Sequence, residues 1–329
     1  MRMYSVTTKM CGLLLSAATA AATAQTIKTQ ISLAQAPVGI AANPLTNKIY
    51  VAVPSYGGGT DTVTVIDGKT DTISADITVP SGAQLPVVDL LHNRVFVVGC
   101  DTYSSTFTCL VTSINTITNK VINSATITTT TGDGILGATY DPVLEKLYLA
   151  DGSNFRIDVV DGTSLKQVDT ISTEGKEPFG LSFDPINGRL YVPYYSNLVQ
   201  IFNASTKAVV DTVRVGSQDV ATAVNWNTGH VFIADNVFGP STTGVADQNG
   251  KLLATVRVSD TPYSLDVDPV TNKAFVVSVG VPALSVIDGA TNTISSSLPG
   301  ISANFISVNF ATEKVYLSTD TGVTVVTEK

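Results

Sequence analysis

The chain has 329 residues, of which 44% are apolar and only 14% are charged, so it can form a large hydrophobic core and is not intrinsically disordered. Its net charge is -8 and its pI is about 4.7. A protein that binds phosphate backbones needs a basic surface, so this balance excludes nucleic acid as a partner.

The first 24 residues have the organisation of a secretory signal peptide. Arg2 and Lys9 give a positive start, Cys11–Ala22 is a short apolar run, and Ala22–Ala24 is an A-x-A cleavage site before Gln25. A transmembrane anchor is the alternative, but the run is shorter than the roughly 20 residues that a membrane-spanning helix needs. The sequence therefore predicts residues 1–24 as a cleaved leader and residues 25–329 as a single exported domain, which is periplasmic, secreted or on the cell surface.

Two cysteines remain after the predicted cleavage, Cys100 and Cys109. They flank the segment 101–108, which lies between two strand-like runs. In an oxidising compartment such a pair predicts a disulfide that pins a hairpin loop. A redox or metal pair is less favoured, because the spacing is not C-x-x-C and no histidine is close in sequence.

A single pattern recurs seven times at intervals of about 40 to 50 residues. Each copy opens with Asn or Asp, whose side chain stabilises a turn by bonding to nearby backbone. These residues are Asn43, Asp89, Asp141, Asp184, Asn225, Asp268 and Asn309. Seven residues later each copy has an aromatic side chain, which is Tyr50, Phe96, Tyr148, Tyr191, Phe232, Phe275 or Tyr316.

Each copy contains four strand-like segments, except the last, which ends after its third, Gly322–Lys329. In the first copy a short strand (Val38–Ala42) precedes the turn, the aromatic strand follows, and Thr62–Ile73 continues through an Asp-Gly turn into Thr72–Val79. Four-stranded antiparallel units of this length predict an all-β, seven-bladed β-propeller. A β-helix and a linear repeat array are the alternatives. A propeller also explains the chain ends, because the spare strand Thr26–Ala34 can complete the last blade.

The repeat resembles the YVTN-repeat β-propellers, also called YncE-like proteins. The likeness rests on "NKIYVA" (Asn47–Ala52), "GRLYVP" (Gly188–Pro193), "NKAFVV" (Asn272–Val277) and "TVIDGKTDTI" (Thr64–Ile73), and it extends over nearly the whole mature chain. It weakens in the second and fifth copies. The resemblance implies an exported or cell-surface propeller and carries no shared catalytic residues.

A ligand site is predicted on the face opposite the repeated turns, where the copies differ most. Variable loops on a rigid scaffold commonly carry binding sites. The candidate ligand-binding residues there are Tyr56, Tyr103, Phe179, Tyr195, Asp235 and Tyr263, which together suit a sugar, a cation or a basic peptide. Ordinary solvated loops with aromatics packed between blades are the alternative interpretation.

Asp266 is a further candidate, because it breaks the repeat. The residues at its position in the other copies are small or apolar: Ala41, Val87, Thr139, Ser182, Ala223 and Ser307. A carboxylate on this innermost strand is expected to face the central channel, where it could bind a cation or orient a ligand. The alternative is a channel acid that bonds only to water and backbone.

Catalytic signatures are missing from the sequence. The two histidines, His92 and His230, fall in turns, and no C-x-x-C-H, H-E-x-x-H, phosphate-binding glycine loop or G-x-S-x-G is present. The favoured function is therefore a non-enzymatic binding or scaffold protein, monomeric, without metal, cofactor or transmembrane segment, that binds a protein, peptide or carbohydrate. The alternative is a carboxylate- or metal-dependent hydrolase or lyase, like a lactonase, acting on a sugar or lactone. An electron-transfer or quinoprotein partner ranks third.

Overall fold

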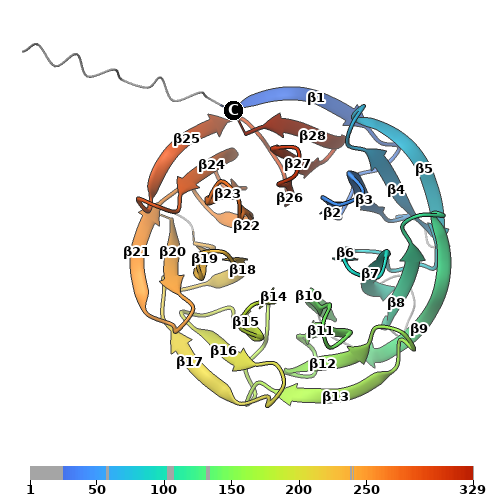
Figure 1. Ribbon diagram of the computed structural model, residues 1–329, viewed down its shortest axis with the longest axis horizontal. Coiled ribbons are helices and arrows are strands. Elements are labelled where there is room, and N and C mark those ends of the chain that lie inside the picture. The colour runs from blue at the N-terminus through green and yellow to red at the C-terminus, as the bar shows by residue number, and fades with distance from the viewer. Residues whose placement is uncertain are drawn as a thin grey trace, which may run out of the picture.

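The computed structural model describes residues 25–56, 59–101, 107–130, 134–237, 239 and 241–328. These residues form seven four-stranded antiparallel sheets, arranged as the blades of a closed ring (Figure 1). The predicted all-β, seven-bladed β-propeller is therefore confirmed. The described residues contain no helix long and apolar enough to cross a membrane.

Each blade runs from an innermost strand near the ring axis to an outermost strand at the rim. Blade 1 contains β2 (Gly39–Asn43), β3 (Lys48–Val53), β4 (Asp61–Asp67) and β5 (Thr72–Val79). Blade 2 contains β6 (Leu85–Asp89), β7 (Arg94–Asp101), β8 (Phe107–Asn115) and β9 (Lys120–Thr130). Blade 3 contains β10 (Ile135–Asp141), β11 (Lys146–Asp151), β12 (Arg156–Asp161) and β13 (Gln167–Ser172). Blade 4 contains β14 (Ser182–Asp184), β15 (Arg189–Pro193), β16 (Val199–Asn203) and β17 (Val209–Val213). Blade 5 contains β18 (Asp219–Asn225), β19 (His230–Asp235), β20 (Thr242–Asp247) and β21 (Leu252–Arg257). Blade 6 contains β22 (Pro262–Asp268), β23 (Lys273–Ser278), β24 (Ala283–Asp288) and β25 (Thr293–Pro299).

The seventh blade joins the two ends of the chain. It contains β26 (Phe305–Asn309), β27 (Lys314–Thr319), β28 (Gly322–Thr327) and, as its outermost strand, β1 (Thr26–Ser32). Strands β1 and β28 pair antiparallel, from Thr26 opposite Thr327 to Ser32 opposite Gly322. The ring closure predicted from the spare N-terminal strand is confirmed, and it leaves β28 with a partner on both sides.

The repeated Asn or Asp forms the same turn in every blade. Its side-chain oxygen accepts a hydrogen bond from the amide two residues on, at 2.6 to 3.2 Å. The aromatic residue of each copy lies on the second strand and is at most 1% exposed. It packs in the apolar layers between blades, as Tyr50 does beside Val95 and Val97 of the next blade. The opening motif is therefore structural.

The predicted Asp-Gly turn of blade 1 is longer than a tight two-residue hairpin loop. Asp67 ends β4, and a four-residue turn runs from Gly68 to Asp71, where the backbone is left-handed with φ 55°. Gly68 is required for a different reason. Its amide donates to the carbonyl of Asn47 at 2.8 Å, and a Cβ there would lie 2.1 Å from the Asn47 side chain. The glycine therefore allows the two turns of a blade to touch.

The basic residue after the repeated turn has a role that the repeat alone did not reveal. In five blades it reaches a backbone carbonyl of the following blade. The pairs are Lys48 with Thr116, Arg94 with Gly162, Arg189 with Gln248, Lys273 with Glu328, and Lys314 with Gly68. These residues therefore tie neighbouring blades together at one face of the ring.

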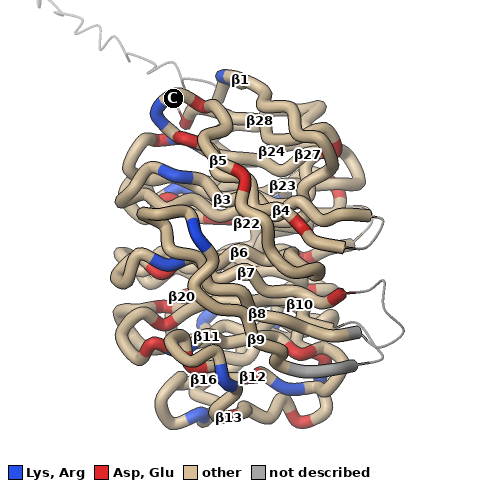
Figure 2. Tube along the Cα trace, turned by 90° about the vertical axis from the view of Figure 1, so that its right-hand side faces the viewer, with Lys and Arg blue, Asp and Glu red and all other residues tan. Residues whose placement is uncertain are grey.

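The ring has two faces, which form the left and right edges in the side view of Figure 2. The turns after the first and third strands of each blade lie on one face, here called the turn face. The loops between the second and third strands, and the connections between blades, lie on the other, here called the loop face.

Candidate functional site

The loop face is hollowed around the ring axis by a cavity of about 340 Å³. It is lined by Val38, Pro54, Tyr56, Asp61, Ser81, Gly82, Gln84, Leu85, Cys100, Asp101, Ile135, Leu136, Phe179, Tyr263 and Phe305. Three of the predicted ligand residues, Tyr56, Phe179 and Tyr263, are therefore brought to one cavity. Its volume lies in the range of known small-molecule sites.

The blades build this cavity from equivalent positions. Val38, Leu136, Phe179 and Tyr263 all lie at the loop-face end of an innermost strand, three residues before the position that pairs with the buried aromatic. Leu85 and Phe305 lie one residue later in their blades. Because a closed ring brings these strand ends together at its axis, residues far apart in sequence form one apolar lining.

Aromatic rings make up much of the wall. Tyr263 and Phe305, from neighbouring blades, meet edge to face with centroids 6.0 Å apart. Phe179 stacks on Tyr195 at 5.4 Å, so the predicted residue Tyr195 supports the wall from outside, with its own side chain 52% exposed. Burial raises the pKa of Tyr263, which keeps its phenol neutral.

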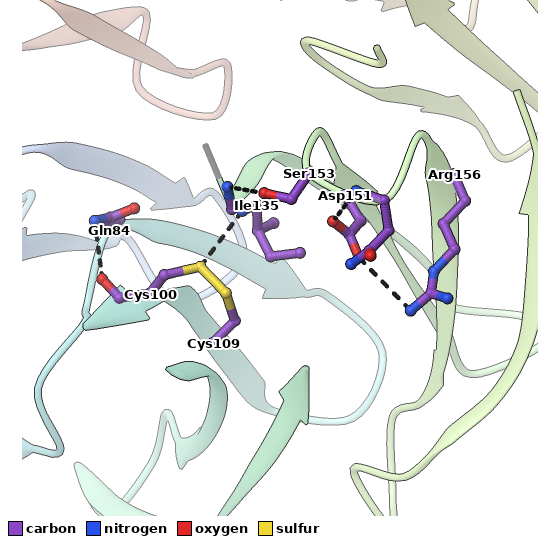
Figure 3. Close-up of a disulfide and its surroundings, with 9 residues drawn as sticks. Gln84, Cys100, Cys109, Ile135, Asp151, Ser153 and Arg156 are labelled. Atoms are coloured by element: carbon purple, nitrogen blue, oxygen red, sulfur yellow. Dashed lines mark hydrogen bonds and ion pairs between the residues drawn. A yellow bond between two sulfur atoms is a disulfide. The ribbon is translucent and has the colours of Figure 1, made fainter. Parts of the chain in front are cut away.

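Cys100 lines the cavity, and Figure 3 shows its disulfide with Cys109. Cys100 and Cys109 are directly opposite one another on β7 and β8, with an S–S distance of 2.00 Å. The Sγ atom of Cys100 accepts the Ile135 amide at 3.4 Å, and the Gln84 side chain donates to the Cys100 carbonyl at 3.4 Å. The disulfide therefore fixes the blade 2 hairpin, and the hydrogen bond from Ile135 joins that hairpin to blade 3 where both line the cavity.

Among the described residues, two carboxylates and no lysine or arginine line the cavity. Asp61 is only 2% exposed, and its oxygens accept the amides of Ser55, Gly82 and Ala83 at 2.7 to 2.8 Å. Asp101 is the second and is partly exposed. The lining therefore favours a neutral or positively charged ligand with an apolar or aromatic body.

The other two predicted acids do not line the cavity. Asp235 is buried and its Oδ1 accepts the amides of Ser217 and Gln218 at 2.9 Å, which fixes the connection between blades 4 and 5. Asp266 bridges two innermost strands, because its Oδ1 accepts the Val267 amide and its Oδ2 accepts the Val308 amide of blade 7, both at 2.8 Å. Burial raises the pKa of Asp266 to about 6. Both oxygens of Asp266 are thus engaged by backbone. Tyr103 lies outside the described residues.

A further buried acid, Asp219, lies next to Asp235. Asp219 opens β18 opposite Asp235, is 0% exposed, and neither of its oxygens has a hydrogen-bond partner among the described residues. Burial, reinforced by the charge of Asp235, raises the pKa of Asp219 to about 8. At neutral pH this carboxyl is therefore mainly protonated.

The carboxylates of the loop face do not converge. Within the described part of the chain, no group of three or more His, Cys, Asp or Glu side chains could hold a metal ion. His92 lies on the turn face, where its Nδ1 is 3.0 Å from Asp89 Oδ2, and it does not reach the cavity. No family model matches the chain, and a search of the curated proteins also finds no match.

Much of the apolar lining was not predicted from the sequence. Val38, Leu85, Leu136 and Phe305 were not singled out, since apolar residues at the start of a strand are expected to be core. The repeat alignment contained a usable signal for these residues. Two or three residues before the innermost-strand position that pairs with the buried aromatic, the copies carry side chains that differ from blade to blade.

Proposed function

We propose that the protein is an exported, non-enzymatic binding or scaffold propeller of the YVTN-repeat type. It holds a small ligand, or one side chain of a partner, in the loop-face cavity. The observation that carries this proposal is the cavity itself, to which six of the seven blades contribute and which aromatic rings from different blades line.

The dispersed acids support binding rather than metal-assisted hydrolysis. A lactonase-like mechanism needs several carboxylates to meet around one ion. Here the carboxylates of Asp61 and Asp266 accept hydrogen bonds from backbone amides, and Asp235 accepts them from the connection between blades 4 and 5. The export part of the proposal is supported by the leader-like residues 1–24 and by the disulfide, which is typical of oxidising compartments.

Calorimetric titration tests the cavity as the binding site. The probes are choline and its neutral carbon analogue dimethylbutanol, phenyltrimethylammonium, and a neutral disaccharide. We expect the cations with apolar bodies to bind, and Tyr263→Leu to weaken that binding about tenfold because a wall ring is lost. Phe155→Leu is the matched control, since Phe155 is a 47% exposed loop-face ring that does not line the cavity.

Equal weakening by both variants, or binding by none of the probes, would argue against the cavity as a small-molecule site. Catalysis is tested in the same preparation by incubation with a simple sugar lactone. Hydrolysis that disappears in Tyr263→Leu would overturn the non-enzymatic part of the proposal.

A further inference from the structure

The turn face carries a ring of exposed aliphatic side chains. They occupy one position of the repeat, two residues after the recurring Asn or Asp. Leu45, Leu91, Val143, Ile186 and Val270 are there, and each is between 61% and 73% exposed. Single exposed apolar residues are normal on proteins, but the same position in five blades places these five around one end of the ring axis.

The fold does not require aliphatic residues at this position. Blades 5 and 7 have Asn227 and Ala311 there, and their amides make the same bond to the turn-forming side chain, at 3.0 and 3.2 Å. Leu45 makes that bond at 3.0 Å with a side chain that is 69% exposed. The aliphatic side chains therefore serve something other than the turn.

An aromatic pair lies on the same face. Trp226 and Phe310 stand where four other blades have proline, and both are half-buried. Their rings meet edge to face, with centroids 6.0 Å apart, although their blades are separated by blade 6. Trp226 is the single tryptophan of the chain. Amphipathic aromatic rings of this kind are enriched where proteins meet the headgroup level of a bilayer.

Exposed lysines surround this apolar ring. Lys69, Lys120, Lys166, Lys207 and Lys251 lie in the outer turns of the same face and all are exposed, although Lys207 forms an ion pair with Asp169. The acids of these turns are less accessible, because Asp67, Asp161 and Asp247 are half-buried and accept their own turn amides. In the side view of Figure 2 most Lys and Arg lie toward the left edge, which is the turn face, and Asp and Glu are interspersed with them.

We infer that the turn face docks on a phospholipid surface containing anionic lipids. The aliphatic ring and Trp226 enter the headgroup region, and the outer lysines meet lipid phosphates. A bilayer is favoured over a protein partner because the contact is broad, lies on one side of the ring, and combines aliphatic tips, an interfacial tryptophan and a lysine border. The loop-face cavity stays open to solvent in this orientation.

Vesicle flotation tests this docking. The protein from Gln25 onward, which contains all seven blades, is mixed with vesicles of equal parts phosphatidylcholine and phosphatidylglycerol. We expect it to float with the vesicles, with the Trp226 emission shifted to the blue. The triple variant Leu45→Ser, Val143→Ser, Ile186→Ser should bind about tenfold more weakly, because three anchors are lost.

A matched triple variant on the rim, Val168→Ser, Val210→Ser, Leu253→Ser, removes exposed aliphatics from outermost strands and should bind as the unchanged protein does. Failure to float, or equal loss in both triple variants, would overturn the proposal. Self-association in solution that the turn-face triple variant abolishes would also overturn it, because a second copy would then cover the face.

Discussion

The Nζ atom of Lys314 lies 2.8 Å from Oδ1 of Asp71, and this contact joins the last blade to the first. Lys28, from the N-terminal strand, lies 2.6 Å from the other oxygen of the same carboxylate. One aspartate of blade 1 therefore binds both chain ends that make up blade 7. Burial alone would raise the pKa of Asp71, but the hydrogen bonds from Lys28 and Lys314 hold it below its ordinary value.

Replacing this aspartate should weaken the ring closure. In Asp71→Asn the buried Lys314 loses its charged partner, so we expect the free energy of unfolding to fall by about 3 kcal/mol. The control is Asp169→Asn, whose ion pair with Lys207 is about 40% exposed and should cost less than about 1 kcal/mol. Urea unfolding of both variants measures the two losses in unfolding free energy. Similar losses would show that Asp71 is no more important than a surface ion pair.

The same carboxylate gives an acid-side pH dependence. Because its pKa is lowered in the folded state, its stabilisation is complete above the ordinary pKa of 3.8 and is lost as the pH falls below that value. We expect the difference in unfolding free energy between wild type and Asp71→Asn to shrink below pH 3.8. A difference that stays constant on acidification would contradict the ionised state of Asp71.

Asp219 should reduce folding stability as the pH rises, which is the opposite of the effect of Asp71. Its folded pKa is raised from 3.8 to about 8, so the ionisation of Asp219 adds no penalty below pH 3.8 and a growing penalty to folding as the pH rises between these values. Asp219→Asn removes the ionisable group with little change in shape. The variant should unfold at a higher temperature than wild type at pH 8 and show no such gain at pH 4. A loss of stability at both pH values would indicate a partner for the Asp219 carboxylate.

The disulfide should affect both stability and the cavity. Reduction, or the pair Cys100→Ala and Cys109→Ala, opens a short loop and should cost roughly 2 to 3 kcal/mol. Since Cys100 and Ile135 both line the cavity, probe binding should weaken as well. Unfolding and calorimetric titration, with and without reductant, measure the two effects. Stability loss with unchanged binding would show that the cavity wall does not depend on the bond.

Removing β1 should uncover the edge of β28. A chain that begins at Leu33 lacks the strand that pairs from Thr26 to Ser32, and Lys28 leaves Asp71. We expect a lower unfolding temperature and oligomers in size-exclusion chromatography, since open strand edges pair with other chains. A stable monomeric truncated chain would contradict the role of β1 in closing the ring.

The repeat explains why the fold could be predicted and most of the site could not. Asn43 and Tyr50 recur because every blade needs the same turn and the same buried ring, so their period gives blade number, strand order and closure. Side chains such as Leu136 and Phe305 come from strands that only ring closure brings together, so the sequence of one copy does not show that they share a site. Asp266 broke the repeat for a structural reason, its bond to the Val308 amide of the next blade.

The most direct test of the binding account is a crystal structure with the tightest-binding probe present. The account predicts the probe in the loop-face cavity, in contact with Phe179 and Tyr263 and close to Asp101, with the blades unmoved. A probe bound elsewhere while the cavity remains empty, or one converted to a product there, would contradict it.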